Sequence, residues 1–432
     1  MDKAGAGSVA AATFWAFFVD QYASTSYIFI APFVAPLFFP SGNYFVSILV
    51  FFVTYGSQLM VRPVGSALWG VRADRIGRKK LLTYTSLAVT LLLAAIGAFP
   101  DYAQAGVVAP LLLELDSLAL GLVTGVLTAS SHTMGFEQIR EKRRGLMGGL
   151  LGSAPHASAV AGSIWFTVLA ASVGVPAIVH FWWRVYFGVG ILGLVLPVFI
   201  HFRVRESALF ERVREKGMTV KDPLKQVFSP ALRRHFLQAF LAASLWGIFI
   251  AGFGPLVPTY VFTTTSVPRA SIGELVLGLQ AGSMVTTWVG GFVSQYLGRK
   301  RTMLLGSILI SVYAFSFHGL AGVGSDVAAA VGYTTLIGMV QGIGGGAYIS
   351  FIAESFPTQL RGTGMAMSIN LGQSTVGLFG IAVASLLSFG LTFPVVAVTA
   401  SLLVALATFA FSVQAPETRG SMATEEAALA GT

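Results

Sequence analysis

Long apolar runs alternate with short polar connections along almost the whole chain. Each run is roughly 20 to 29 residues long, enough for a helix rising 1.5 Å per residue to cross a hydrocarbon core of about 30 Å. The pattern predicts an all-α polytopic membrane protein with twelve membrane-spanning helices, near residues 11–39, 45–70, 81–99, 107–135, 145–172, 177–202, 235–263, 272–297, 302–322, 326–352, 362–388 and 391–413. The first run is too long for a signal-peptide core, so we expect it to stay in the mature protein.

The composition also favours lipid as the solvent of these helices. Hydrophobic residues make up 55% of the 432 residues and charged residues only 10%, against about 25% in an average soluble protein. Cysteine is absent, which excludes disulfides, thiolate catalysis and cysteine-ligated metal. Since the sequence shows no nucleophile–base set and no cluster of metal ligands, we expect no enzyme, no metal site and no organic cofactor.

The basic residues predict the orientation of the chain. Of the 27 Lys and Arg residues, 24 lie at the N-terminus, in the connections after the even-numbered helices, or in the tail; Arg62, Arg184 and Arg269 do not. Because basic connections stay on the cytoplasmic side, we expect both termini in the cytoplasm and the helices in a cytoplasmic (inner or plasma) membrane. The net charge of +9 is then a topology signal, and no nucleic-acid partner is expected.

The two halves of the chain repeat one another. The connection 70–80, after the second predicted helix, matches the connection 291–301, after the eighth, and Gly77 and Gly298 are 221 residues apart. Glu137 and the Arg144 that follows it recur as Glu354 and Arg361, offset by 217 residues.

Both motifs recur after nearly the same number of residues. This predicts two parallel six-helix repeats with a solute site between them near the membrane midplane. The predicted units are an N-terminal bundle (1–202), a cytoplasmic linker (203–234), a C-terminal bundle (235–413) and a cytoplasmic tail (414–432).

These connections resemble those of the major facilitator superfamily, whose signature loop after the second helix is matched by residues 70–80. The chain is more closely similar to the metabolite:proton symporter branch of that family. The stretches that carry this resemblance are 62–65, 137–145, 183–184, 205–212, 354–362 and 416–420. The resemblance implies alternating access, with helices 1, 2, 4, 5, 7, 8, 10 and 11 around the cavity.

The sequence also departs from the family pattern. Helix 4 of the family usually carries an Arg-x-x-Gln-Gly pattern, but residues 113–117 read Leu-Glu-Leu-Asp-Ser. A membrane glutamate common in this branch falls near Leu122 and Val123, and Gln295 stands in the second loop where Asp74 stands in the first. A mechanism that uses the missing arginine and glutamate therefore does not transfer to this chain.

Asp20 is the main candidate for proton coupling. It lies about 9 residues into the first predicted helix, roughly 14 Å from its cytoplasmic end, which is close to the midplane. A charge in hydrocarbon costs roughly 2.5–3.5 kcal/mol, and burial favours the protonated form of a carboxylic acid. Such a group can load and release a proton, and the proton is the coupling ion that we expect. The alternative is a structural carboxylate bonded to a neighbouring Tyr or a helix end.

Three further groups are candidates for proton coupling. Glu114 and Asp116 lie in the outer third of helix 4, where the alternative is hydration at the outer surface. His156, beside Pro155 in helix 5, has a side chain whose ordinary pKa near 6.5 suits a proton shared with Asp20, and its alternative is a hydrogen-bonded core histidine.

Arg62 and several neutral polar residues are candidates for solute binding. As a cation within helix 2, Arg62 favours an anionic or zwitterionic solute, although packing at the inner gate also accounts for it. The other predicted solute ligands are Tyr55, Gln58, Trp246, Gln280, Asn370 and Gln373, for each of which helix packing is the alternative.

Charged residues of the cytoplasmic connections predict a gate. We expect Asp74 to pair with arginines or a helix end, and Glu137 with Arg144 and Glu354 with Arg361 to join it when the inner side is closed. The predicted gate residues are Asp74, Arg75, Arg78, Glu137, Arg144, Glu354 and Arg361. Topology control alone is the alternative, because single exposed pairs contribute only ~0.2–1 kcal/mol.

Glycines 145, 148, 149 and 152 in helix 5, and 342, 344, 345 and 346 in helix 10, predict close helix approach. Together these features predict a secondary transporter that takes up a small organic acid or similar polar metabolite with protons, acting as a monomer in contact with lipid. The alternatives are a proton-coupled efflux antiporter and a membrane sensor without transport, and the tail of about 19 residues leaves little room for a signalling domain.

Overall fold

The computed structural model describes residues 3–42, 44–204, 206, 222–252, 257, 260–261, 264–268, 271–388 and 391–421. Every regular element in these ranges is a helix. The first group of elements is α1 (Lys3–Phe38), α2 (Tyr44–Ile76), α3 (Arg78–Ile96), α4 (Tyr102–Ala105), α5 (Val108–Glu137), η1 (Glu141–Arg143), α6 (Arg144–Val173), α7 (Val175–Ala177), η2 (Ile178–Trp182), α8 (Trp183–Gly188), η3 (Val189–Leu194) and α9 (Val195–Arg203).

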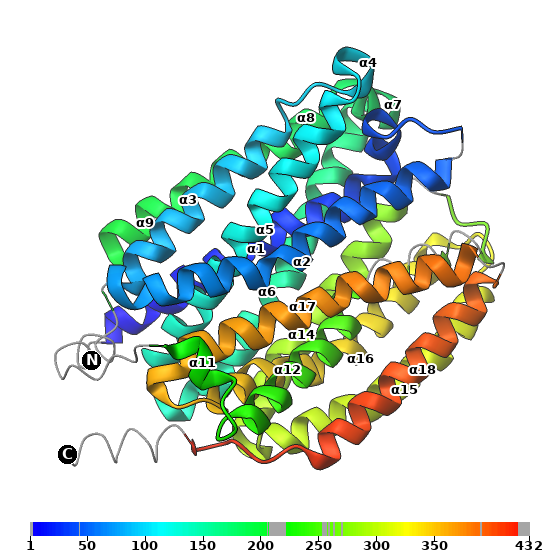
Figure 1. Ribbon diagram of the computed structural model, residues 1–432. Helices are drawn as coiled ribbons and strands as arrows, with labels where there is room; N and C mark the ends of the chain where they lie inside the picture. Colours follow the sequence, from blue (N-terminus) through cyan, green and yellow to red (C-terminus); the bar gives the residue numbers. More distant parts are fainter. Residues whose placement is uncertain are drawn as a thin grey trace, which may run out of the picture.

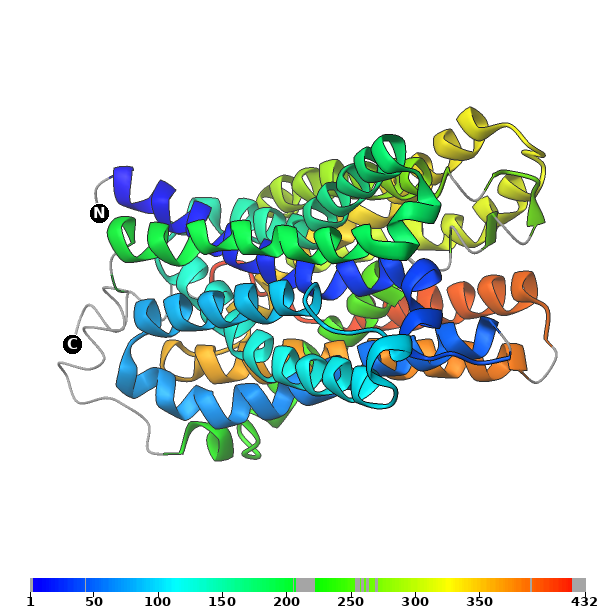
Figure 2. The same ribbon diagram turned by 90° about the horizontal axis from the view of Figure 1, so that it is seen from above.

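The second group follows the segment around residue 206. It comprises α11 (Pro223–Val227), α12 (Arg233–Gly247), η4 (Ile248–Gly252), α14 (Ile272–Leu297), α15 (Arg299–Ala321), α16 (Val327–Glu354), α17 (Thr358–Ser388) and α18 (Phe393–Gln414). In Figure 1 the two groups of helices lie beside one another, and the start of α1 lies at the same end of the molecule as the end of α18 and the described residues after it. Figure 2, seen from above, agrees; we call this the terminal end.

Most helices match the apolar runs, although α1 begins eight residues before its run and α2 ends six residues after its run, and two runs are divided. The predicted helix 177–202 is divided into α7, the π-helix η2, α8, the 3₁₀-helix η3 and α9. The predicted helix 235–263 runs as α12 to Gly247 and as a π-helix to Gly252, and part of its remainder lies outside the described residues. In that π-helix, the loosened carbonyls of Phe249 and Ile250 accept hydrogen bonds from Nε2 of Gln341 at 3.1 and 2.9 Å.

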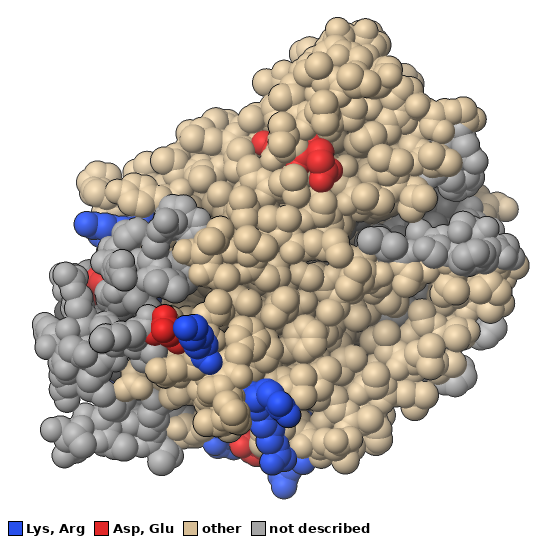
Figure 3. Space-filling view, viewed as in Figure 1, with Lys and Arg blue, Asp and Glu red and all other residues tan. Residues whose placement is uncertain are grey.

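The lateral surface is apolar. Eight helices in the described part of the chain are long and apolar enough to cross a membrane. Large side chains such as Leu192 and Leu406, each 64% exposed, face outward, which is unusual in a soluble monomer. On the face drawn in Figure 3, Lys and Arg side chains gather near the terminal end, and the described residues further from it are uncharged apart from one acidic patch.

A seam of glycines lets α6 and α14 touch at the level of their backbones. A Cβ atom at Gly149 would lie 2.9 Å from Cα of Gly291, and one at Gly291 would lie 2.5 Å from Cα of Gly149. A Cβ at Gly145 would lie 2.6 Å from the carbonyl oxygen of Gly291. Only glycine fits such an approach, so the two groups of helices meet here with no side chains between them.

The repeat found in the sequence is also present in the packing. Glycines 121 and 125 of α5 lie against the backbone carbonyls of Gln58 and Arg62 in α2. Glycines 338 and 342 of α16 lie in the same way against the carbonyls of Leu279 and Ser283 in α14. The α2–α5 pair in one group and the α14–α16 pair in the other therefore pack in the same way, with glycines of one helix against the backbone of the other.

A proline in α2 joins the two groups of helices. Pro63 has no N–H, so the carbonyl of Leu59, four residues earlier, loses its partner within the helix. The hydroxyl of Ser374 in α17 donates a 3.0 Å hydrogen bond to this carbonyl. The cost of the proline is thereby offset by a contact across the boundary.

Candidate functional site

A buried ion pair forms the centre of the site. Nη2 of Arg62 on α2 lies 2.9 Å from Oδ1 of Asp20 on α1, and both side chains are 0% exposed. Separate helices supply the two charges, and the apolar periodicity of neither helix indicated that they would meet. Because each charge is stable in hydrocarbon only beside the other, loss of one partner leaves a charge that costs about 3–5 kcal/mol.

Hydroxyl and amide groups complete the coordination of the pair. Thr128 on α5 donates a short hydrogen bond to Oδ2 of Asp20. Arg62 donates from Nη2 to Oγ of Ser24 at 2.6 Å and from Nη1 to Oε1 of Gln373 at 2.5 Å. Gln373 belongs to α17, so the guanidinium connects the two groups of helices.

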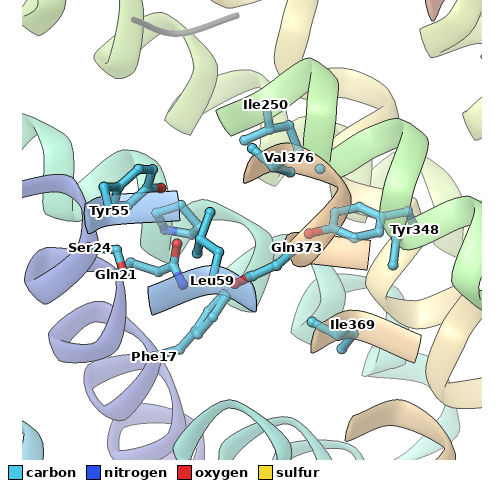
Figure 4. A pocket seen from close by; sticks show the side chains of 13 residues that line it. Phe17, Gln21, Ser24, Tyr55, Leu59, Ile250, Tyr348, Ile369, Gln373 and Val376 are labelled. Atoms are coloured by element: carbon cyan, nitrogen blue, oxygen red, sulfur yellow. The ribbon is translucent and has the colours of Figure 1, made fainter. Parts of the chain in front are cut away.

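A small cavity lies beside this pair. Its wall includes Phe17, Gln21 and Ser24 of α1, Tyr55 and Leu59 of α2, and Tyr348, Ile369 and Gln373 of the second group. Figure 4 shows Tyr55, Ser24 and Phe17 on one side, with Gln373, Tyr348 and Val376 facing them from the other. The centres of water molecules have about 40 Å³ available, whereas one water needs roughly 10–15 Å³. The cavity thus has room for a few waters, and an organic solute needs a wider form.

His156 also connects the two groups of helices. Its Nδ1 lies 2.7 Å from Oε1 of Gln280 on α14, and the residue is 1% exposed. One turn closer to the terminal end, Nε1 of Trp288 donates a 2.5 Å hydrogen bond to Ser153. The structure therefore pairs two predicted residues, His156 and Gln280, with each other.

The remaining predicted solute ligands lie at different depths. Gln58 is 0% exposed and donates to Ser24 at 3.4 Å, just behind the cavity wall. Asn370 donates to Oγ of Ser66 at 2.5 Å and to the carbonyl of Gly125 at 2.9 Å, at the contact of α17 with α2 and α5. Trp246 is not in the described cavity wall.

Trp246 instead fills the core of the second group of helices. It is 0% exposed, and its ring lies against Gly344 of α16 and Gly306 of α15, where a Cβ atom would overlap it. This explains one of the glycines predicted to permit close packing. The surroundings of Trp246 are those of a packing residue.

Glu114 and Asp116 lie away from the ion pair. Asp116 precedes Thr128 by 12 residues of α5, roughly 18 Å along the helix. Glu114 accepts a 2.6 Å hydrogen bond from Ser57 of α2, and Asp116 is 6% exposed. Oδ2 of Asp116 has no hydrogen-bond partner in the described ranges. The structure therefore does not bring these two carboxylates together with Asp20.

Two equivalent ion pairs stand at the terminal end. Arg78 at the start of α3 pairs with Glu137 at the end of α5. Nη2 of Arg299 at the start of α15 lies 2.8 Å from Oε1 of Glu354 at the end of α16, both side chains being 1% exposed. Nε of Arg299 donates to Oε2 of the same carboxylate at 3.0 Å, which makes this pair bidentate.

Each of these arginines also begins a helix that a carboxylate caps. The backbone N–H groups of Arg78 and Lys79 donate to Glu206 at 3.1–3.2 Å. Those of Arg299 and Lys300 donate to Glu417 at 2.9 and 3.2 Å. A negative charge at a helix N-terminus accepts hydrogen bonds from the free N–H groups and is attracted to the positive end of the helix dipole. The segment after α9 and the tail after α18 are therefore attached in the same way.

Two carboxylates of the predicted gate contact arginines that the sequence interpretation did not pair with them. Glu137 and Glu354 bond the arginines that begin α3 and α15. Nε of Arg361 donates to the carbonyl of Ala353 at 3.2 Å. The side chain of Arg144 is buried, and its carbonyl accepts a 3.1 Å bond from Ser350 of α16. The side chains of Asp74 and Arg75 lie outside the described residues.

Gln295 closes the terminal end between the two groups. Its Oε1 accepts from the backbone N–H of Gly145 at 2.8 Å, and its Nε2 donates to the carbonyl of Glu141 at 3.3 Å. An uncharged amide thus joins α14 to the start of α6.

The sequence interpretation missed Thr128, Ser24 and Arg299 as interacting residues. Serine and threonine occur throughout membrane helices, where most of them bond the backbone of their own helix, so composition gives no signal. The repeat did contain a signal for Arg299, because Gly298-Arg299 matches Gly77-Arg78. The described residues contain no group of three metal-ligating side chains.

Comparison with known proteins agrees with this architecture. The family model of the Major Facilitator Superfamily matches residues 13–368. The inner membrane metabolite transport protein YhjE of Escherichia coli (strain K12) is 27% identical over 367 residues, covering 82% of this chain and 81% of that protein. The citrate-proton symporter of Klebsiella pneumoniae is 26% identical over 382 residues, covering 84% and 81%.

A solved structure confirms the fold. The proton:xylose symporter XylE bound to 6-bromo-6-deoxy-D-glucose superposes with a TM-score of 0.76 over 99% of this chain and 100% of that chain, at 14% identity. The predicted twelve-helix fold of two six-helix repeats is therefore confirmed, as is the prediction of a transporter and not an enzyme. This chain belongs to the Major Facilitator Superfamily and is a multi-pass membrane transporter of a small solute.

Proposed function

We propose that this transporter couples proton uptake to the import of a small anionic or zwitterionic metabolite by alternating access. The observation that carries the proposal is the Asp20–Arg62 pair, which is shut off from solvent beside a cavity at the boundary of the two helix groups. A proton can neutralise Asp20 in place of Arg62, and a solute carboxylate can bind Arg62 in place of Asp20. The citrate-proton symporter relative supports both the class of solute and the coupling ion.

Protonation of Asp20 would free Arg62 for the solute. Once Asp20 is neutral, the planar guanidinium has lost its anion and seeks another carboxylate, which it can bind through two parallel hydrogen bonds. Conversely, a bound solute anion satisfies Arg62 and makes proton uptake by Asp20 less costly. Proton and solute would therefore bind cooperatively, which is the requirement for symport.

Rocking of the two predicted bundles, 1–202 and 235–413, would expose the site to each side in turn. The contacts of Gln295 and Ser350 at the terminal end would break as that end opens, and the α6–α14 contact further along, at His156 and Gln280, would persist. Positive residues near that end support the placement of both termini in the cytoplasm and of the helices in the inner membrane. We propose a functional monomer, since each chain contains both repeats.

Uptake by purified protein in liposomes tests this function. Labelled citrate and the zwitterion glycine betaine are offered with and without an inward pH gradient. We expect gradient-stimulated accumulation of at least one of them. Asp20→Asn should abolish accumulation, while exchange of solute across the membrane partly survives because it needs no net proton movement.

The matched control is Asp222→Asn, which removes a carboxylate of a surface pair with Lys225 and should leave accumulation unchanged. Full gradient-driven accumulation by Asp20→Asn would remove Asp20 from coupling. The alternative, a proton-coupled efflux antiporter, predicts that an inward pH gradient empties preloaded liposomes.

A further inference from the structure

His132 is a buried titratable residue that the proposed function does not yet use. It lies on α5, is 0% exposed, and begins the last two turns before the terminal end of that helix. The imidazole packs edge-on against Phe17 of α1, with ring centroids 4.4 Å apart and planes at 78°. Phe17 also lines the cavity, so a single aromatic ring stands between His132 and the solute site.

The hydrogen bonds of His132 determine which nitrogen carries its proton. Nδ1 lies 2.7 Å from the backbone carbonyl of Thr128, and that oxygen can only accept. Oγ of Ser131 lies 3.3 Å from the same nitrogen, but its hydroxyl donates to the Thr128 carbonyl at 3.0 Å. Nδ1 of the neutral ring therefore carries the hydrogen, and Nε2 presents a lone pair. Within the part of the chain that the structure describes, Nε2 has no hydrogen-bond partner. The imidazole is thus held as a base whose accepting nitrogen is unoccupied.

Thr128 also places this base close to Asp20. Its hydroxyl donates to Oδ2 of Asp20, and its carbonyl holds His132 one helical turn further along. On the facing helix, Phe17 lies about one turn from Asp20 in the same direction. Asp20 and His132 are therefore successive groups along the α1–α5 contact, roughly 5–6 Å apart along its axis, with His132 nearer the terminal end.

We propose that His132 accepts the proton from Asp20 when the terminal end opens, and that it passes this proton to water on that side. The O–H bond of protonated Asp20 breaks and an N–H bond forms at Nε2, directly or through one water. Asp20 becomes a carboxylate that pairs again with Arg62, and the imidazolium then loses the same proton to bulk water. This inference rests on the proposed proton coupling and adds the route by which the proton leaves.

The surrounding charges favour the second transfer. Tyrosines apart, the titratable and charged side chains described on the helices packed against α5 are Asp20 of α1, Arg62 of α2, Arg78, Lys79 and Lys80 of α3, Arg144 and His156 of α6, Glu354 of α16 and Arg361 of α17. On α5 itself, Glu114 and Asp116 lie four or more turns away, and Glu137 is paired with Arg78. Most of the groups on the packed helices are cations, which repel an imidazolium, and the carboxylate of Glu354 forms an ion pair with Arg299. These cations therefore disfavour the imidazolium, so His132 holds the proton only briefly before water takes it.

His132→Asn is the discriminating variant, because an Asn side-chain NH₂ can replace the Nδ1 donor to Thr128 while the basic Nε2 is lost. For whichever of citrate and glycine betaine the wild type accumulates, we expect gradient-driven uptake to fall by on the order of tenfold to a hundredfold. Exchange of the same solute should stay within about twofold of the wild type, since a fully loaded carrier needs no proton release. The matched control is His235→Gln, an exposed histidine at the start of α12.

Chemical rescue separates proton transfer from a structural role. Imidazole enclosed in the liposomes should restore uptake by His132→Ala to within about threefold of the wild type, and should not restore Asp20→Asn. Equal loss of uptake and exchange in His132→Asn, or no loss of either, would overturn the proposal.

A second measurement needs no solute. In protein labelled with ¹⁵N-histidine, the signal that disappears in His132→Asn should report a neutral ring with hydrogen on Nδ1. Hydrogen on Nε2 would overturn the proposal even if transport is never detected, whereas failure of the wild type to transport contradicts only the proposed function.

Discussion

Arg62 and Gln373 lie 311 positions apart in the chain and are joined by a hydrogen bond of 2.5 Å. The other end of the guanidinium holds Asp20, so a single side chain connects the proton site to the opposite helix group. A change of charge on Asp20 therefore alters how firmly the two groups are held together. This connection is the basis for the first prediction.

Gln373→Glu should slow transport by holding the cavity closed. The new carboxylate would form a second buried ion pair with Arg62, between α2 and α17, where the present bond is to a neutral amide. Charge-assisted hydrogen bonds are roughly twice as strong as neutral ones. We expect turnover in liposomes to fall by on the order of tenfold, with a raised melting temperature of the solute-free protein.

The companion variant Gln373→Ala removes the connection without adding charge, and its melting temperature should be lower than that of the wild type. If Gln373→Glu turned over at the wild-type rate, the bond from Arg62 to α17 would have no part in closing the cavity.

Asp20 and Arg62 should show strong coupling in stability. Asp20→Asn leaves a buried guanidinium without its anion, and Arg62→Gln leaves a buried carboxylate, so each single variant should lose about 3–5 kcal/mol. The double variant contains neither charge and should be more stable than the less stable single variant. Thermal unfolding of the four proteins in one detergent measures the cycle; additive losses would show that the two charges do not depend on each other.

The glycine seam should tolerate no methyl group. Gly149→Ala would press Cβ against Cα of Gly291, and overpacking of this kind typically costs about 1–3 kcal/mol. We expect lower stability and slower transport. Gly332→Ala in α16 is the control, because a Cβ atom there meets nothing within 4 Å and alanine favours a helix by about 1 kcal/mol. Similar effects of the two substitutions would exclude close approach as the cause.

The two carboxylate caps should have equal effects. Glu206→Gln and Glu417→Gln each weaken the binding of two backbone N–H groups at a helix start, for about 0.5–2 kcal/mol. Hydrogen exchange should increase around residues 78–82 in the first variant and around 299–303 in the second. A change in only one of the two variants would mean that the two caps, although alike in geometry, do not contribute equally to stability.

Trp246→Phe distinguishes a packing role from a solute-stacking role. The residue lies against Gly344 and Gly306 away from the cavity wall, so we expect a loss of stability and unchanged solute affinity. An affinity reduced by tenfold or more would restore the prediction that Trp246 stacks on the solute. Binding measured by competition in detergent is sufficient.

The apolar runs predicted most helices well because lipid requires each spanning segment to satisfy its backbone internally and to be apolar along its length. The region 177–202 is broken for a reason that the runs do not contain. A Cβ atom at Gly190 would meet Leu93, and one at Gly193 would meet Thr90, so the helix there follows the surface of α3 closely. Three glycines within six residues were the available signal.

The site was harder to predict than the helices. Depth along a helix follows from counting residues, which placed Asp20 near the membrane midplane. Rotation about each helix axis depends on packing with neighbours, which a single sequence does not contain. For that reason the pairing of Asp20 with Arg62 was not foreseen, and the sequence left both solute binding and helix packing open for Trp246.

The proline in α2 links the movement of the protein to hydration. The carbonyl of Leu59 is satisfied by Ser374 only while α2 and α17 are in contact. When they separate, water must enter and solvate that oxygen, because a bare carbonyl in an apolar seam is costly. Solutes that lower water activity should therefore favour the packed form, which makes osmotic strength a variable that acts on the transport cycle itself.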